Sequence, residues 1–170
     1  LIKGLAMFVT AVIAFGSNLQ QPAEQVRRAA AAVAALDGVR LLRLSSLYRT
    51  APVGYTDQPD FINAAALVES DWDAETLLRA LQNIEQAFGR ERSFRNAPRT
   101  LDLDIIDFNG ESHHSSSLTL PHPLAVERAF VMYPLAEIAP DYVLNGQTAA
   151  EIAATLPSDG IVKLNDEQTA

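Results

Sequence analysis

Two aspartates stand two residues apart in the run Leu101-Asp-Leu-Asp-Ile105. Successive side chains of a β-strand point to opposite faces, so Asp102 and Asp104 share one face and the aliphatic residues take the other. Carboxylates on one strand face repel each other, and aspartate is a poor strand former. The pair is therefore either the solvated face of a half-exposed strand or a set of hard oxygen ligands for a divalent cation such as Mg2+.

The segment just before this strand is strongly basic. Its four cations face a single acid, Glu91, which leaves a charge of +3 in a chain of net charge −8; they are Arg90, Arg92, Arg95 and Arg99. Arginine suits bidentate contact with phosphate oxygens. A loop of this kind can simply balance nearby acids. Where it leads into an Asp-x-Asp strand, it also indicates the handling of a magnesium–nucleotide polyphosphate.

Three more residues are candidates for ligand contact. His122 lies between two prolines that fix its backbone, and a rigid histidine could donate a hydrogen bond to a phosphate if one binds nearby. Asn63 interrupts an apolar run, which indicates either a strand end or an amide paired with the donors and acceptors of a ligand. Phe61 shares its strand face and is either a core aromatic or a contact for a heterocycle.

Apolar periodicity and turn residues locate the elements that must position these side chains. Strands are predicted over residues 9–15, 39–48, 61–68 and 101–108. One helix begins at Pro22 and is stopped by Gly38, and a second runs from an Asp73 N-cap to Gly89. The order β-α-β-β-α-β predicts an α+β, ferredoxin-like core, an antiparallel sheet with both helices on one face. C-terminal helices are expected near residues 131–139 and 148–156.

Composition excludes several classes of site and protein. The chain has 170 residues, enough for one domain over residues 1–170, and no cysteine, which excludes disulfides, thiolate zinc sites and iron–sulfur clusters. No two of its glycines are closer than twelve residues, so neither a dinucleotide fingerprint nor a P-loop is present. The net charge of −8 argues against a nucleic-acid binder.

The apolar stretch near the N-terminus is more typical of a buried strand than of a signal peptide. It is too short to span a bilayer and continues into Gly16-Ser-Asn18 without a small-x-small cleavage site. Met7 is a candidate start, which would make residues 1–6 non-native or disordered. We expect a cytoplasmic monomer that binds neither membrane nor nucleic acid.

Motifs in six segments, in one order along most of the chain, make the sequence recognisable. They lie at 14–19, 46–54, 57–65, 84–92, 98–105 and 120–130, and the run Pro98-Arg-Thr-Leu-Asp-Leu-Asp104 is highly specific. The chain closely resembles the 6-hydroxymethyl-7,8-dihydropterin pyrophosphokinases of folate biosynthesis. The resemblance implies a ferredoxin-like core and transfer of pyrophosphate from ATP to the pterin hydroxymethyl group, with release of AMP. It also implies two Mg2+ ions.

The resemblance further implies residue roles. Asp102 and Asp104 match the ligands of both Mg2+ ions, and Arg90, Arg92 and Arg99 match loop arginines in phosphate handling and catalysis. The positions that match nucleotide contacts are Gln82, Glu85, Arg92, Ile105, Thr119, His122 and Arg128. Those that match the pterin site are the lining residues Thr50, Ala51 and Val53, the amide of Asn63, and the stacking aromatics Phe61 and Phe130.

Two functions without this chemistry use comparable folds. A sheet-surface RNA binder needs exposed aromatics beside basic residues on central strands, and the net charge opposes it. A ligand-sensing regulatory domain would not need an aspartate pair beside four arginines. Formation of AMP from ATP and the pterin separates all three functions.

Overall fold

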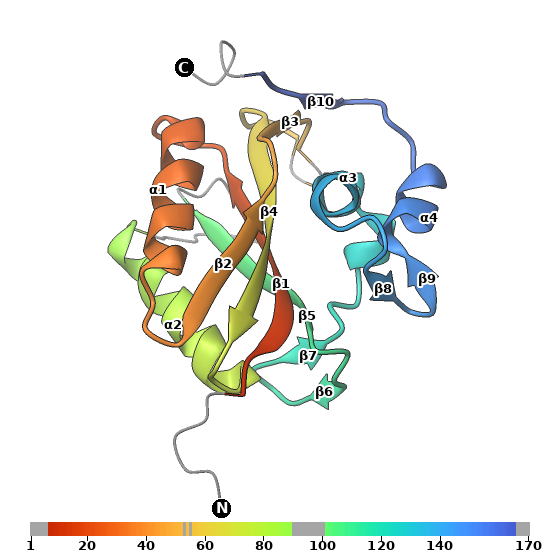
Figure 1. Ribbon diagram of the computed structural model, residues 1–170. Coiled ribbons are helices and arrows are strands. Elements are labelled where there is room, and N and C mark those ends of the chain that lie inside the picture. Colours follow the sequence, from red (N-terminus) through yellow and green to blue (C-terminus); the bar gives the residue numbers. More distant parts are fainter. Residues whose placement is uncertain (1–6, 53, 55, 90–100, 166–170) are drawn as a thin grey trace, which may run out of the picture.

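The computed structural model describes residues 7–52, 54, 56–89 and 101–165. An antiparallel sheet in the order β10-β3-β4-β1-β5, with β2 also paired to β4, forms its centre (Figure 1). Helices α1 and α2 lie on one face, which confirms the predicted ferredoxin-like α+β core. The elements of this core are β1 (Val9–Ser17), α1 (Pro22–Ala34), β2 (Val39–Leu44), β3 (Tyr48–Thr50), β4 (Phe61–Ser70), α2 (Ala74–Ala87), β5 (Asp102–Phe108) and β10 (Ile161–Lys163).

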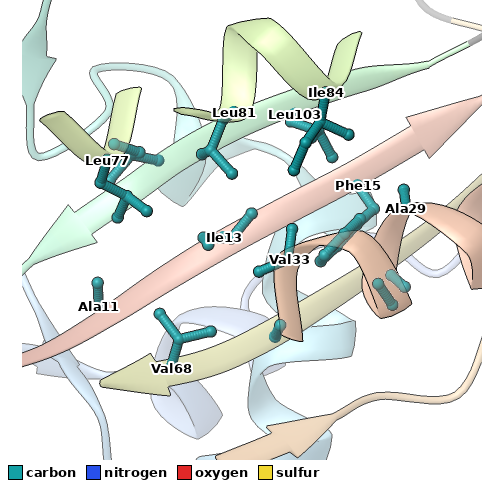
Figure 2. Close-up of a cluster of buried hydrophobic side chains, with 14 of the residues drawn as sticks. Ala11, Ile13, Phe15, Ala29, Val33, Val68, Leu77, Leu81, Ile84 and Leu103 are labelled. Carbon is teal, nitrogen blue, oxygen red and sulfur yellow. The ribbon is translucent and has the colours of Figure 1, made fainter. Parts of the chain in front are cut away.

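The main hydrophobic core lies between the sheet and these two helices. Apolar residues recur along α1 at helical spacing, so that Val26 and Val33 are both buried. The Asp73 carboxylate accepts a hydrogen bond from the Thr76 N–H at 2.9 Å and caps α2, as predicted. Side chains of both helices meet those of β1, β4 and β5 (Figure 2), among them Ile13, Phe15, Val33, Val68, Leu77, Leu81 and Leu103.

The other face of the sheet is covered by the C-terminal part of the chain. Helices α3 (Ala129–Ile138) and α4 (Ala149–Ala154) lie on this side (Figure 1). Met132 and Leu135 of α3 share a second buried cluster with Ile106 of β5. Both predicted C-terminal helices are thus present. Shorter elements precede α3, namely β6 (His113–His114), β7 (Thr119–Leu120) and η1 (Ala125–Glu127), and two more lie between α3 and α4, namely β8 (Val143–Leu144) and β9 (Gln147–Thr148).

The single strand predicted over 39–48 is wrong, because the structure divides it into β2 and β3. Both pair with β4, β3 with its first residues and β2 with its second half. Between them the Ser45 N–H donates to the Ala65 carbonyl at 2.9 Å, and the Ser45 Oγ accepts the Ala65 N–H at 2.9 Å. The chain can bend here because the serine hydroxyl replaces the missing main-chain acceptor.

The end of one helix and the presence of one strand also differ from prediction. Helix α1 ends at Ala34 rather than at Gly38. Gly38 instead packs under an indole, since a Cβ there would come within 2.3 Å of Trp72 Cε2. Strand β10 was not predicted, because its three residues are too few to show an alternation. No helix in the described part of the chain is long and apolar enough to cross a membrane.

Candidate active site

Asp102 and Asp104 lie on the face of β5 turned away from α1 and α2. The aliphatic residues between and beside them, Leu101, Leu103 and Ile105, are buried in the core under those helices. Both aspartates are only half-buried. The predicted alternation of a carboxylate face with an aliphatic face is therefore confirmed.

The strand register places Asp102 in line with Asn63. Gly16 of β1 pairs with Asp102 on one side and with Asn63 on the other. Adjacent strands lie about 4.8 Å apart, so the backbones at the amide and the carboxylate are separated by roughly 10 Å. A Cβ on Gly16 would lie 3.0 Å from Asn63 Nδ2, so the amide leans over the glycine. The lack of a side chain at Gly16 thus lets the Asn63 amide take this position.

The Asn63 amide is buried and held by two internal partners. Its Oδ1 accepts a hydrogen bond from Thr50 Oγ1 at 2.6 Å, and its Nδ2 donates to the Phe15 carbonyl at 3.3 Å. A primary amide has two N–H groups and two lone pairs, so one of each remains after these two bonds. The position of Asn63, third in β4, fits a strand end, and the two partners fix an orientation that leaves groups for a ligand.

Two aromatic rings, Phe61 and Phe130, are predicted to stack on the pterin. Phe61 is half-buried, and its Cδ1 lies 3.9 Å from the position a Gly16 Cβ would take. Phe130, in the first turn of α3, is also half-buried, and the Arg128 guanidinium lies 5.5 Å from its ring centroid. Phe61 therefore borders the row formed by Asn63, Gly16 and Asp102, as its strand face predicts.

A main-chain hydrogen bond holds His122 beside β5. Its main-chain N–H donates to the Ile106 carbonyl at 2.8 Å, and its Nδ1 accepts the Leu124 N–H at 3.2 Å. The neutral ring therefore carries its proton on Nε2. Burial lowers the pKa of His122, and the Arg128 cation lowers it further, while the Asp102 carboxylate opposes both. The structure thus brings these three predicted site residues within electrostatic reach of one another.

Other predicted nucleotide contacts lie along the outer edge of β5. Glu85 of α2 is buried and accepts the Leu103 N–H at 2.8 Å. Gln82, one helical turn earlier, and Thr119 of β7 are exposed. The side chain of Ile105 lies in the core. Alternate residues of a strand direct their main-chain groups to the same edge, so Ile105 presents its N–H and carbonyl, like Leu103, to this outer edge.

The remaining predicted residues lie outside the described ranges or are not placed beside Asn63, Gly16 and Asp102. Ala51 is exposed, and its N–H donates to the Gly160 carbonyl at 2.9 Å, which ties the predicted pterin loop to the segment before β10. Within the ranges that are described, no group of three or more histidine or acidic side chains could hold a metal ion. The predicted residues outside the described ranges are Val53, Arg90, Arg92 and Arg99.

Sequence reasoning missed two features of the site. The first is the place of Gly16 between Asn63 and Asp102, which depends on strand register. The second is Glu137, whose carboxylate accepts hydrogen bonds from Ser46 and Tyr48. Its one available signal was that Glu137 is the only charged residue among the ten of α3.

A match to a protein-family model identifies the family of this chain. The model of 7,8-dihydro-6-hydroxymethylpterin-pyrophosphokinase (HPPK) matches residues 12–140. The chain belongs to the HPPK family. It is 42% identical over 158 residues to the 2-amino-4-hydroxy-6-hydroxymethyldihydropteridine pyrophosphokinase of Haemophilus influenzae, which covers 92% of this chain and 99% of that one. For the Pseudomonas aeruginosa protein of the same name, identity is 43% over 153 residues, 89% of this chain and 94% of that one.

Solved HPPK structures agree in fold. A Plasmodium falciparum HPPK-DHPS crystal structure with pterin and p-hydroxybenzoate superposes with a TM-score of 0.72 at 13% identity and covers 95% of this chain. This chain spans 48% of that longer protein. Since HPPK is an ATP-dependent transferase of folate biosynthesis, the prediction of an enzyme is confirmed. The RNA-binding and ligand-sensing alternatives are set aside.

Proposed function

We propose that the open face of the sheet is where this HPPK transfers pyrophosphate from ATP to the hydroxymethyl group of 6-hydroxymethyl-7,8-dihydropterin. One observation supports this most directly. Asn63, Gly16 and Asp102 stand in one row across three paired strands. The amide suits a heterocycle, the carboxylate suits a metal–phosphate group, and the glycine leaves room for the substrate between them.

The pterin end of the proposed site is built around Asn63. Its free N–H and lone pair would pair with an acceptor and a donor on the pterin ring, while Thr50 holds the amide in orientation. A flat heterocycle also stacks well on aromatic rings, and Phe61 and Phe130 are assigned this contact. Ala51 and Val53 complete the proposed lining of the pterin site.

The nucleotide end is assigned to the residues beside β5. His122 presents Nε2–H to a phosphate oxygen, because its Nδ1 already accepts the Leu124 N–H. Arg128 lies close enough to lower the pKa of His122 and would neutralise the same phosphates. The base and ribose would lie along the outer edge of β5, against Gln82, Glu85, Thr119 and the main chain of Ile105.

The donor set fits a divalent cation. Asp102 and Asp104 offer hard carboxylate oxygens on one half-buried strand face. With only these two protein ligands, water and phosphate oxygens would fill the remaining positions, which is how Mg2+ is usually held with nucleotides. We assign two Mg2+ ions to this pair. When bound, the ions would neutralise phosphate charge and lower the pKa of the attacking hydroxyl.

The reaction requires positioning more than covalent chemistry. The pterin hydroxyl oxygen forms a bond to the β-phosphorus, the bond from that phosphorus to the AMP oxygen breaks, and the hydroxyl proton leaves to solvent. No nucleophilic side chain takes part. The chain's own residues hold the two substrates in line, and His122 and Arg128 stabilise charge on the phosphates. Arg90, Arg92 and Arg99 are assigned to the transferring group.

The test is formation of AMP from ATP, Mg2+ and the hydroxymethyl pterin by the purified protein. Asn63→Ala should weaken pterin binding by about 1–3 kcal/mol while leaving the Kd for ATP nearly unchanged. Equal losses for both ligands in a calorimetric titration would contradict the assignment of Asn63. AMP formation that is independent of the pterin would contradict the proposed reaction.

Four further expectations belong to the same proposal. We propose that the chain acts as one domain, as a monomer, in the cytoplasm, without membrane or nucleic-acid partners. The lack of cysteine is compatible with a reducing compartment, because the fold needs no disulfide. Light scattering at working concentration tests the monomer, and a dimer mass would refute it.

A further inference from the structure

Glu137 is the centre of a polar cluster at the end of α3. Its Oε1 accepts the Ser46 N–H at 3.0 Å and the Tyr48 hydroxyl at 2.8 Å. Its Oε2 accepts the Ser46 hydroxyl at 2.8 Å and lies 3.6 Å from Lys163 Nζ of β10. One carboxylate therefore joins α3 to the turn before β3, to β3 itself and to β10.

The strand held in this way is the one that orients Asn63. Tyr48 pairs with Asn63 in the register of β3 and β4. Two residues further along β3, Thr50 donates its hydroxyl to Asn63 Oδ1 at 2.6 Å. Strand β3 pairs with β4 on one side and with β10 on the other, and the contacts to Glu137 add side-chain bonds from α3 to this short strand.

The same helix carries the other half of the site. Arg128 is the N-cap residue of α3, and Phe130 lies in its first turn, whereas Glu137 lies in its last. Helix α3 thus connects a predicted phosphate ligand and a predicted stacking ring to the strand that orients the predicted pterin amide. The Glu137 contacts therefore join the helix that carries one group to the strand that carries the other.

The protonation states in this cluster are defined. Burial alone would raise the pKa of Glu137, but hydrogen bonds from Ser46 and Tyr48, and the charge of Lys163, outweigh it and lower that pKa. Burial and the bond to Glu137 raise the pKa of Tyr48. The carboxylate therefore accepts every one of these bonds near neutral pH. A glutamine would place its NH2 group, in either orientation, against one group that can only donate: Lys163 Nζ or the Ser46 N–H.

We propose that Glu137 is a positioning residue for the pterin: it fixes β3 so that Thr50 holds the Asn63 amide ready for the substrate. This inference rests on the proposed function, because it takes Asn63 as a pterin contact. As a positioning residue, Glu137 would contact neither substrate. Its effect should therefore appear in pterin binding and not in nucleotide binding.

The experiment compares Glu137→Gln with a matched control, Glu75→Gln. The Glu75 carboxylate also accepts hydroxyl hydrogen bonds, from Ser115 and Ser117, but it lies in α2 and ties down a different loop. For Glu137→Gln we expect KM for the pterin to rise about tenfold, with KM for ATP within about twofold of wild type. The control should leave both constants near wild type. A milder variant, Tyr48→Phe, removes one bond only and keeps the test open if Glu137→Gln fails to fold.

A double-mutant cycle with Asn63→Ala separates positioning from general destabilisation. If Glu137 acts through Asn63, the Glu137→Gln change should alter pterin affinity by less than about twofold once the amide is gone. Equal effects in both backgrounds, or equal rises in KM for both substrates, would overturn the proposal. Failure of the wild-type protein to form AMP would instead refute the proposed function, so the two failures are distinguishable.

Discussion

Replacing Gly16 with alanine tests the geometry of the site more directly than removing any of its polar groups. Gly16 pairs with both Asn63 and Asp102, and its backbone does not require a positive φ. The added methyl would therefore cause no backbone strain. It would enter the space between the amide and the carboxylate, where we place the substrate.

The size of the effect follows from two distances. The new Cβ would lie 3.0 Å from Asn63 Nδ2 and 3.9 Å from Phe61 Cδ1. The first contact is too short, so the amide must move by a few tenths of an ångström, and its bond to the Phe15 carbonyl is already long at 3.3 Å. A displaced Asn63 amide leaves hydrogen-bonding groups of the pterin unpaired. The cost is about 1–3 kcal/mol of binding free energy, roughly 5- to 150-fold in Kd.

Calorimetric titration measures the effect on pterin binding, and thermal melts measure the effect on stability. We expect weaker pterin binding with a loss of stability of about 1 kcal/mol or less. Gly146→Ala is the matched control: its φ of 78° strains an alanine, but nothing lies within 4 Å of the new Cβ. It should lose about 1 kcal/mol of stability and bind the pterin normally. If Gly16→Ala binds the pterin as wild type does, the substrate does not lie over Gly16.

Three further predictions concern other parts of the molecule. Asp102→Asn should abolish AMP formation at fixed Mg2+ while the melting temperature without Mg2+ holds or rises, because the change relieves repulsion from Asp104; an easily unfolded but active variant would show that Asp102 is structural. Gly38→Ala should destabilise the fold by about 1–3 kcal/mol in urea titrations, since its Cβ would meet Trp72 at 2.3 Å, and an unchanged midpoint would refute this. Because burial lowers the pKa of His122 in the folded protein, the unfolded chain binds more protons below about pH 6.5, so stability should fall as the pH falls through that range. Thermal melts over this range should show a shallower fall for His122→Gln, and identical slopes would contradict the reasoning.

Local patterns were enough to predict the core of the fold. The alternation in β5, the Asp73 cap and the β-α-β-β-α-β order each depend on residues close together in the sequence. The break at Ser45 was missed because a hydroxyl that replaces a main-chain acceptor leaves no mark in apolar periodicity. Strand β10 was missed because three residues are too few for a pattern.

In the candidate site, too, local patterns predicted some residues but not their arrangement in space. Residue types pointed to Asp102, Asn63 and His122 without any structure. The row through Gly16 could not be predicted, because it requires the register of three strands that are far apart in the chain. The bonds from Ser46 and Tyr48 to Glu137 likewise join residues about ninety positions apart, which no local pattern specifies.

The division of the predicted strand 39–48 also affects how the protein behaves at high concentration. Leu42 and Leu44 of β2 are 45% and 39% exposed, and a long straight edge of such residues would favour pairing with the edge of another molecule. The register shift between Leu41 and Arg43 and the bend at Ser45 limit the straight run to a few residues. The bend that separates β3 from β2 therefore also shortens the straight edge on which another molecule could pair.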